Sequence, residues 1–111
     1  MNIKEWEIWW ADVMFEDSNE HKRRPVLVLN DCQGLLIDTV KITSHSKRDI
    51  FDVEINEWKS CGLSKSSTVR LDKVVVLNRN KFISKIGDLS SKDKIKIRLV
   101  LGRGQRPKQN G

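Results

Sequence analysis

The chain has 111 residues, enough for one domain with its own core. It contains only two cysteines, Cys32 and Cys61, and neither belongs to a CxxC pair. This composition excludes the disulfide framework of a small secreted protein. His21 and His45 do not stand at metal-ligand spacing from the cysteines, so we expect two reduced, partly buried thiols and no bound metal or cofactor.

The formal net charge of +6 is confined to the C-terminal end of the chain. Residues 92–111 contain seven basic residues and one acidic residue, whereas residues 1–91 contain fourteen of each. A basic tail attracts phosphates at long range, but solvated tails of this kind are common without that role. A nucleic-acid site in the body of the protein therefore needs a local concentration of charge, for which residues 22–24 and 47–48 are the candidates.

Targeting and membrane signals are missing from the sequence. Its first residues lack the basic-then-apolar order of a signal peptide. No uninterrupted apolar run approaches the ~18 residues that a membrane-spanning helix needs. We therefore expect a soluble, cytoplasmic protein.

The first half of the chain predicts short strands. Residues 7–15 are rich in aromatic side chains and partly alternate, as in a half-buried strand. Residues 16–24 are all polar and predict a loop. Residues 25–29 form an apolar run that suits a fully buried strand, and a further strand is expected at 35–43.

The second half continues this pattern. Residues 51–55 alternate between an apolar and an acidic face, and residues 68–72 alternate before the apolar segment 74–77. The segment 57–67 between them reads as a connection that crosses over a barrel. Several short strands separated by turns predict a mostly β fold, either a small barrel or a sandwich, with little helix.

The C-terminal region gives two conflicting signals. Ser90 followed by Asp93 is typical of a helix N-cap. The apolar residues of the segment 95–101 recur at every second position, as in a strand, but they also fit the i,i+4 spacing of a helix. Three glycines and one proline after residue 101 predict a basic, disordered tail at 102–111 behind a single domain at 1–101.

Thr68, Arg70 and Asp72 form the first candidate cluster. Side chains on a strand alternate between its two faces, so these three share one face while the intervening apolar residues point to the core. A hydroxyl, a cation and a carboxylate are thereby displayed in a row, each about 7 Å from the next. The alternative is an ordinary solvent-facing strand with an Arg/Asp pair, and from these residues alone that interpretation is favoured.

Two further clusters carry polar side chains at strand ends. Thr43, Ser44 and His45 could bind a phosphate, although a turn rich in hydrogen-bonding side chains is the alternative. Arg24 stands where the polar loop enters a buried strand, and it is otherwise explained as solvated or paired with an acidic residue of that loop.

Common catalytic motifs are missing from the sequence. There is no Walker-type phosphate loop, no GxSxG, no HExxH and no set of acidic or histidine residues spaced for a metal. Trp9 and Trp10 point to opposite faces of one strand, so the tryptophans do not predict a base-stacking platform. Trp6, Trp9 and Trp58 are most simply core or interface residues.

The three clusters nevertheless occur in the order and spacing of one known family. The segments are RRPVLVL at 23–29, ITSH at 42–45 and STVRLD at 67–72. The opening strand at 7–13 and the segment 86–90 are also similar to that family. Over residues 6–101 the chain therefore resembles the PemK/MazF toxins of type II toxin–antitoxin systems.

The resemblance implies a fold and partners. It implies a small SH3-like barrel of the CcdB/PemK/MazF type with a short C-terminal helix. It also implies a homodimer whose paired faces form an RNA groove, and a cognate antitoxin protein that occupies this groove. The implied activity is sequence-specific cleavage of single-stranded RNA (mRNA) without a metal.

The family's catalytic positions map onto Arg24, Thr43, Arg70 and Asp72. In such a reaction the 2′-OH of the RNA attacks the adjacent phosphate and leaves a 2′,3′-cyclic phosphate and a 5′-OH. The two arginines suit the negative charge of the phosphorane, and Asp72 could act as the base or orient Arg70. We expect further RNA contacts from this surface, made by Arg23, Ser44, His45, Lys47 and Thr68.

Two other functions remain open from the sequence. The same barrel could bind nucleic acid or a protein such as a topoisomerase without catalysis, as CcdB-like relatives do. Retention of the four catalytic positions together favours the enzyme. A plain interaction domain with a basic tail would explain the composition but not the ordered motifs.

Overall fold

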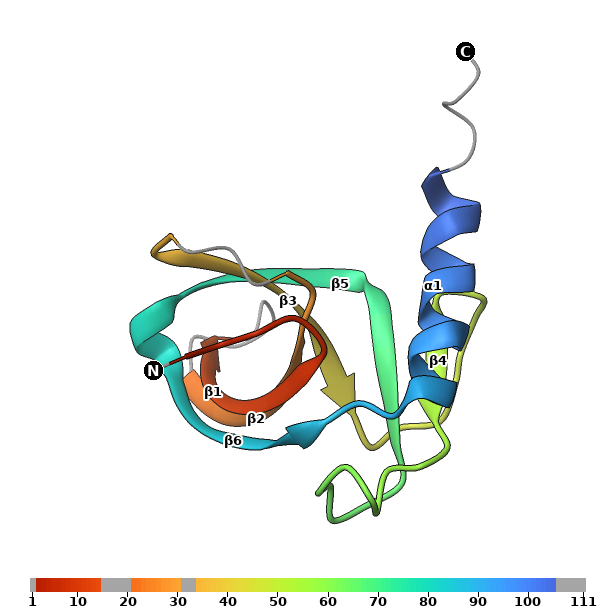
Figure 1. Ribbon diagram of the computed structural model, residues 1–111, viewed down its shortest axis with the longest axis horizontal. Helices are drawn as coiled ribbons and strands as arrows, with labels where there is room; N and C mark the ends of the chain where they lie inside the picture. Colours follow the sequence, from red (N-terminus) through yellow and green to blue (C-terminus); the bar gives the residue numbers. More distant parts are fainter. Residues whose placement is uncertain (1, 15–20, 31–33, 106–111) are drawn as a thin grey trace.

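The computed structural model describes residues 2–14, 21–30 and 34–105. Figure 1 shows a curled sheet with one long helix at its side. The elements in chain order are β1 (Glu7–Met14), β2 (His21–Val28), β3 (Leu36–Thr43), β4 (Asp52–Ile55), β5 (Ser67–Asn78), the 3-10 helix η1 (Arg79–Lys81), β6 (Phe82–Asp88) and α1 (Ser91–Gln105). The predicted mostly β fold with a C-terminal helix is confirmed.

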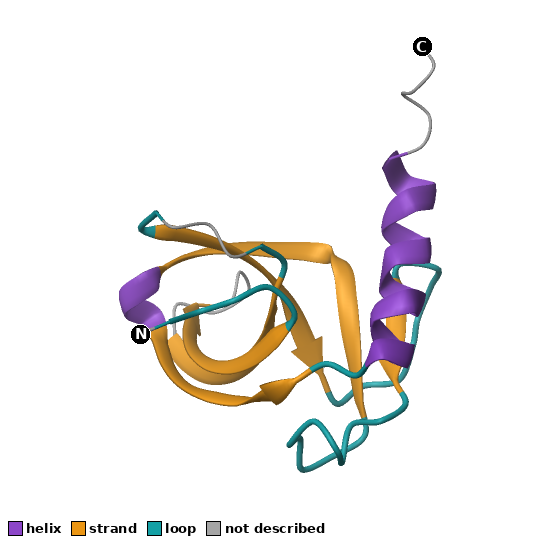
Figure 2. Ribbon diagram, in the orientation of Figure 1, coloured by secondary structure: helices purple, strands orange, loops and turns teal. Residues whose placement is uncertain are grey.

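The strands form one six-stranded antiparallel sheet in the order β4-β5-β3-β2-β1-β6. The sheet curls as a barrel does, but β4 and β6 remain its two edges and do not pair (Figure 2). Strand β5 bends where its register shifts, since Val40 pairs with Val74 and Lys41 pairs with Arg70. The three extra residues of this bulge let one strand serve both β4 and the whole of β3.

Two elements differ from the sequence prediction. Strand β2 begins at His21, so residues 21–24 are strand rather than loop, because β1 continues to pair with them through Asp12↔Arg23 and Ala11↔Arg24. Strand β6 was not predicted. It is a largely exposed edge strand with a weak apolar pattern, which local sequence does not reveal.

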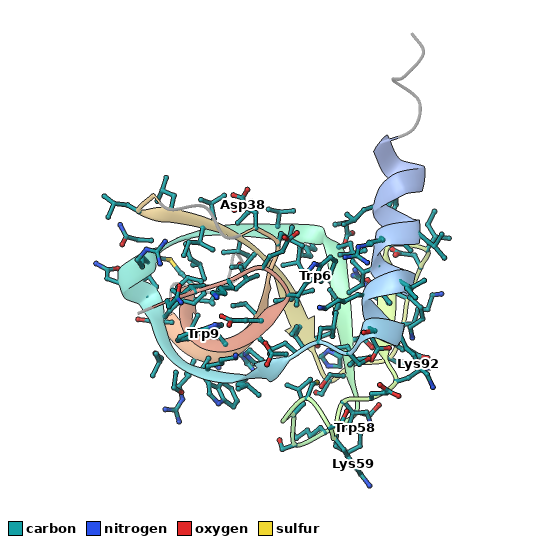
Figure 3. All side chains as sticks on the ribbon, viewed as in Figure 1. Trp6, Trp9, Asp38, Trp58, Lys59 and Lys92 are labelled. Carbon is teal, nitrogen blue, oxygen red and sulfur yellow. The ribbon has the colours of Figure 1, made fainter. Side chains whose placement is uncertain are left out.

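Both faces of the curled sheet carry apolar clusters, which explains the continuous apolar run of β2. Leu27 packs with Ile8 in one cluster, whereas Val26 and Val28 pack with Trp9 in the other. Trp9 lies inside the curl (Figure 3), where its ring meets Phe82 edge-on at 5.8 Å. The prediction that Trp9 points into the core is therefore confirmed.

Helix α1 resolves the conflict between the two C-terminal signals. The Ser90 hydroxyl accepts the Asp93 N–H at 3.2 Å, which is the predicted N-cap. Ile97 enters the core, while Ile95 and Leu99 lie exposed on the outer side of the helix. The helix continues to Gln105, so residues 102–105 belong to it rather than to the predicted tail; glycines weaken a helix but do not end it. Residues 106–111 lie outside the described part.

The helix packs beside β4 at one end of the molecule (Figure 1). Lys94 and Arg98 place their charges over the ring of Trp6, at 5.9 and 5.2 Å from its centroid. Trp6 adopts a positive φ of 72°, and its peptide group bonds to the Val28 carbonyl and the Leu89 N–H. No helix of the described residues is long and apolar enough to cross a membrane.

Candidate nucleic-acid interface

A cleft of about 700 Å³, which we call the first cleft, is lined by residues of β1, β2, β3 and β6, by the turn after β3 and by the segment that runs into β5. It brings together five of the predicted site residues: Arg23, Arg24, Thr43, Ser44 and His45. The remaining lining residues are Trp10, Lys22, Pro25, Lys41, Ile42, Gly62, Leu63, Ser64, Lys65, Ser67 and Ile86.

The strands position the arginines on one wall of this cleft. Because β2 begins at His21, Arg23 and Arg24 are strand residues held by their pairing with β1, not ends of a loop. Trp10 pairs with Pro25 and is half-buried on the same wall. The Arg23 guanidinium lies 5.6 Å from the centre of the Trp10 ring, so a planar cation and an indole face line the cleft together.

The turn after β3 forms the second wall. The His45 N–H donates to Thr43 Oγ1 at 3.2 Å, and that hydroxyl lies 3.1 Å from His45 Nδ1. Which of the hydroxyl and Nδ1 donates in this contact depends on the tautomer of the His45 ring. Thr43 and His45 are thereby oriented as a unit at the cleft.

The third wall is the segment from Gly62 to the first residue of β5, Ser67; its residues Ser64, Lys65 and Ser67 were not predicted to take part. It is held against β6 at Gly62, which has a φ of 96°; a Cβ there would lie 2.5 Å from the Ile86 carbonyl oxygen. Only glycine permits this approach. Figure 3 shows Trp58 and Lys59 at the outer end of the segment.

A second cleft of about 350 Å³ adjoins the first. Arg70 and Asp72 line it, whereas Thr43 does not, so the four predicted catalytic residues are divided between two cavities. Arg24 lines both clefts and joins them. Lys41 also lines both and is the direct cross-strand partner of Arg70. Its central position follows from the sheet register and was not predicted.

The prediction that the side chains of Thr68 and Arg70 lie on a free face of their strand is wrong. Thr68 is 3% exposed and Arg70 9% exposed, because β4 pairs with this part of β5. Thr68 lines neither cleft, and the exposed Lys47 lines neither of them. Asp72, whose side chain is 38% exposed, is the one member of the trio that faces solvent.

Asp52 and Arg48 join Arg70 and Asp72 in an ion-pair network that the sequence did not predict. Asp52 Oδ2 accepts the Arg48 N–H at 2.9 Å and its Nε–H at 3.2 Å, and it lies 4.0 Å from Arg70 Nε. Arg48 Nη2 lies 3.7 Å from Asp72 Oδ1. Among the described residues, Asp52 Oδ1 and Arg70 Nε have no hydrogen-bond partner.

The Asp52 carboxyl is ionised at neutral pH. Burial raises its pKa, but the hydrogen bonds from Arg48 and the charges of Arg48 and Arg70 outweigh burial, so the pKa lies below its usual value. Burial raises the pKa of the Cys61 thiol, which is therefore a core group rather than a nucleophile. Cys32 lies outside the described residues. Within those residues, no three His, Cys, Asp or Glu side chains gather as metal ligands.

A curled antiparallel sheet with a C-terminal helix and two adjoining cationic clefts defines a small, mostly β protein with a basic binding surface. The chain belongs to the family of PemK-like, MazF-like toxins of type II toxin–antitoxin systems, which it matches over residues 4–103. The predicted family is thereby confirmed.

Solved structures have the same fold. MazF from Deinococcus radiodurans has a TM-score of 0.72 and 20% identity, covering 93% of this chain and 96% of that chain. The Mycobacterium tuberculosis toxin MazF-mt6 has a TM-score of 0.72 and 21% identity, covering 87% and 93%. An endoribonuclease in complex with its cognate antitoxin from mycobacterial species has a TM-score of 0.75 and 14% identity, covering 91% and 92%. No curated protein matches the chain.

Proposed function

We propose that this toxin is a sequence-specific endoribonuclease that cleaves single-stranded mRNA in the cytoplasm without a metal ion. The observation that carries the proposal is the junction of the two clefts at Arg24. The hydroxyls of Thr43 and Ser44 and the imidazole of His45 line the first cleft, and the guanidinium of Arg70 and the carboxylate of Asp72 line the second. Family membership and the endoribonucleases of the same fold support this assignment.

Each group has a role in attack by the 2′-OH. Arg24 at the junction and Arg70 in the second cleft stabilise the charge that develops on the phosphorane. Thr43, oriented by His45, positions the phosphate. Asp72 is an exposed carboxylate that lines the second cleft together with these two arginines, and it suits the task of accepting the 2′-OH proton. As the P–O5′ bond breaks, the leaving 5′-oxygen takes up a proton and becomes the 5′-OH end.

Arg23, Ser44 and His45 extend the contacts along the first cleft, where the planar guanidinium of Arg23, placed over the Trp10 ring, offers a surface on which a base can stack. The charge of the cleft walls makes binding depend on salt, since each neutralised phosphate releases counterions.

A second copy of the chain completes the functional unit in this proposal. Met14, Val74 and Val76 are large apolar side chains that lie exposed on β1 and β5, and isologous pairing of such surfaces is the common solution. The cognate antitoxin is the second protein partner and covers the clefts. Sedimentation that finds an active monomer at micromolar concentration would contradict the dimer.

The activity is tested by incubating purified protein with a long single-stranded RNA in EDTA and mapping the ends. We expect cuts at one short sequence that leave 2′,3′-cyclic phosphate and 5′-OH ends. Arg24→Ala protein, purified in the same way, controls for a contaminating nuclease. Activity that disappears in chelator and returns with magnesium would refute the metal-independent route, and RNA binding without cuts would indicate a non-catalytic barrel.

A further inference from the structure

Beside the second cleft lie two charged residues, Arg48 and Asp52, that have no role in the proposed chemistry. We propose that Arg48 binds a phosphate adjacent to the scissile one in this cleft, and that the buried carboxylate of Asp52 positions both Arg48 and Arg70. The inference rests on the proposed RNA cleavage and extends it to a second phosphate subsite.

The charge of the second cleft fits a phosphodiester. Five cationic side chains line it against one carboxylate, that of Asp72. The cleft shares Arg24 and Lys41 with the first cleft, so an RNA strand whose scissile phosphate lies at Arg24 has its neighbouring phosphate within the same basic surface. Its remaining cations, Arg48, Arg70 and Lys73, belong to the second cleft alone.

Arg48 is held at its base and keeps donors at its tip. Its backbone N–H and Nε–H both donate to the same oxygen of Asp52, which fixes the start and the direction of the side chain. The Nη2 atom stands 3.7 Å from Asp72, too far for a hydrogen bond, and the side chain is 43% exposed. A guanidinium has five N–H donors, so this arrangement leaves Nη groups for a bidentate phosphate contact.

Asp52 is poorly satisfied for so buried a carboxylate. It is 1% exposed, yet Oδ1 lacks a hydrogen-bond partner among the described residues and Arg70 Nε stands 4.0 Å from Oδ2 without a bond. A half-satisfied buried pair is a poor source of stability. Its effect is to hold two guanidinium groups on one side of the cleft, and we assign Asp52 as their positioning residue.

The test uses a short RNA with the mapped cleavage sequence in which one phosphate beside the scissile linkage is an uncharged methylphosphonate. On one side of the cut, we expect this change to lower the wild-type kcat/KM by about 10-fold, the size of one charge-assisted hydrogen bond. Arg48→Ala should lose a similar factor on unmodified RNA, and the neutral linkage should then cost it less than about 2-fold, because the two changes remove one contact. Arg48 lies in an exposed loop, so this variant retains the fold.

Asp52→Asn tests the positioning role. It keeps the shape of the side chain but not its charge, and we expect a lower kcat together with loss of the sensitivity to the neutral linkage. A general loosening of the fold would lower kcat without erasing that sensitivity. Matched controls are Glu54→Gln, an exposed carboxylate of the same strand as Asp52, and Lys92→Ala on α1, whose side chain is 83% exposed. Both should behave as the wild type.

The outcomes separate this inference from the proposed function. If the wild type cleaves RNA but Arg48→Ala responds to the neutral linkage as the wild type does, the subsite is wrong and the nuclease stands. If Arg48→Ala leaves RNA untouched and weakens only the binding of an acidic antitoxin peptide, the cleft is a protein site and the inference is overturned. If the wild type cuts no RNA, the proposed function fails, and the salt dependence of binding of a long single-stranded RNA to the wild type and to Arg48→Ala then tests the phosphate contact. If Asp52→Asn does not fold, Arg48→Ala decides alone.

Discussion

Asp52 and Asp93 are both buried carboxylates, but they lie in different regions and differ in how completely their oxygens are hydrogen-bonded. Each is 1% exposed, and each has a pKa held below its usual value against the effect of burial. Asp93 accepts the N–H groups of Asn56 and Glu57 at 3.0 Å each and the Ser90 hydroxyl at 3.1 Å, with Lys96 Nζ at 3.3 Å. Both of its oxygens are therefore bonded.

At Asp52, by contrast, one oxygen carries all the bonds to Arg48 and the other carries none from the described residues. The difference follows location. Asp93 ties the start of α1 to the end of β4, far along the chain, and a complete set of bonds stabilises that junction. Asp52 lies behind the second cleft and holds Arg48 and Arg70, which both line that cleft. Substitutions at the cleft should therefore act on catalysis, and substitutions at the helix junction should act on stability.

The largest effect is expected at the cleft junction. Arg24→Ala should lower the single-turnover cleavage rate by roughly 100-fold or more, because a donor to a developing oxyanion is typically worth ~2.7–4 kcal/mol. Arg70→Lys should remain substantially impaired, since an ammonium does not reproduce the planar fork that Asp52 positions. Rates at saturating RNA measure both effects.

The midpoint of urea unfolding serves as the control for these two variants. Arg24 is exposed, so its loss should leave the midpoint close to that of the wild type. Near-normal cleavage by both variants would contradict the assignment of the cleft as the catalytic site.

The sequence predicted those features that depend on interactions between residues close together in the chain. The alternation of Trp9 and Trp10, the apolar run of β2 and the Ser90–Asp93 cap were each visible in a few neighbouring residues. The motif order also predicted that Arg24, Thr43 and Arg70 would come close together, although in two adjoining cavities.

Long-range packing explains the rest. Alternation over 51–55 placed Asp52 on an exposed acidic face with Glu54, yet the pairing of β4 with β5 buries Asp52 against Arg70 and leaves Glu54 in solvent. The same pairing buries Thr68. Which side chains of a strand are covered depends on segments far along the chain that pair with it and pack against it, and no pattern within five residues carries that information.

The second prediction concerns the helix junction. Asp93→Ala removes the partner of two backbone N–H groups, one hydroxyl and Lys96, and leaves the N–H groups buried without acceptors. We expect the free energy of unfolding to fall by about 3 kcal/mol, as measured by urea denaturation. The cleavage rate of the molecules that remain folded should change less than about 2-fold, because the junction does not line either cleft. A rate loss as large as that of Arg24→Ala would break the comparison between the two regions.

The last prediction is the dependence of stability on acid, and its sign follows from the carboxyl pKa values. Asp52, Asp93 and Glu7 all have pKa values in the folded protein below the ordinary values of 3.8, 3.8 and 4.5. For Glu7 and Asp93, burial opposes the shift, and hydrogen bonds to backbone and side-chain donors outweigh it. The unfolded chain therefore binds protons first as the pH falls. Stability from these groups is complete above the ordinary pKa values and is lost as the pH falls through the folded ones.

Urea unfolding between pH 7 and pH 3 measures this loss. The contribution of these three groups to the free energy of unfolding should stay nearly constant down to about pH 5. Below that pH it should decline by up to about 1.4 kcal/mol per pH unit for each group. Asp93→Asn should be less stable at pH 7 but decline less steeply in acid, because one of the three groups no longer titrates. Glu54→Gln, which removes an exposed carboxylate of the neighbouring strand, is the matched control and should keep the wild-type slope. If the free energy of unfolding of Asp93→Asn fell with pH in parallel to that of the wild type, protonation of Asp93 would not be a source of the loss of stability in acid.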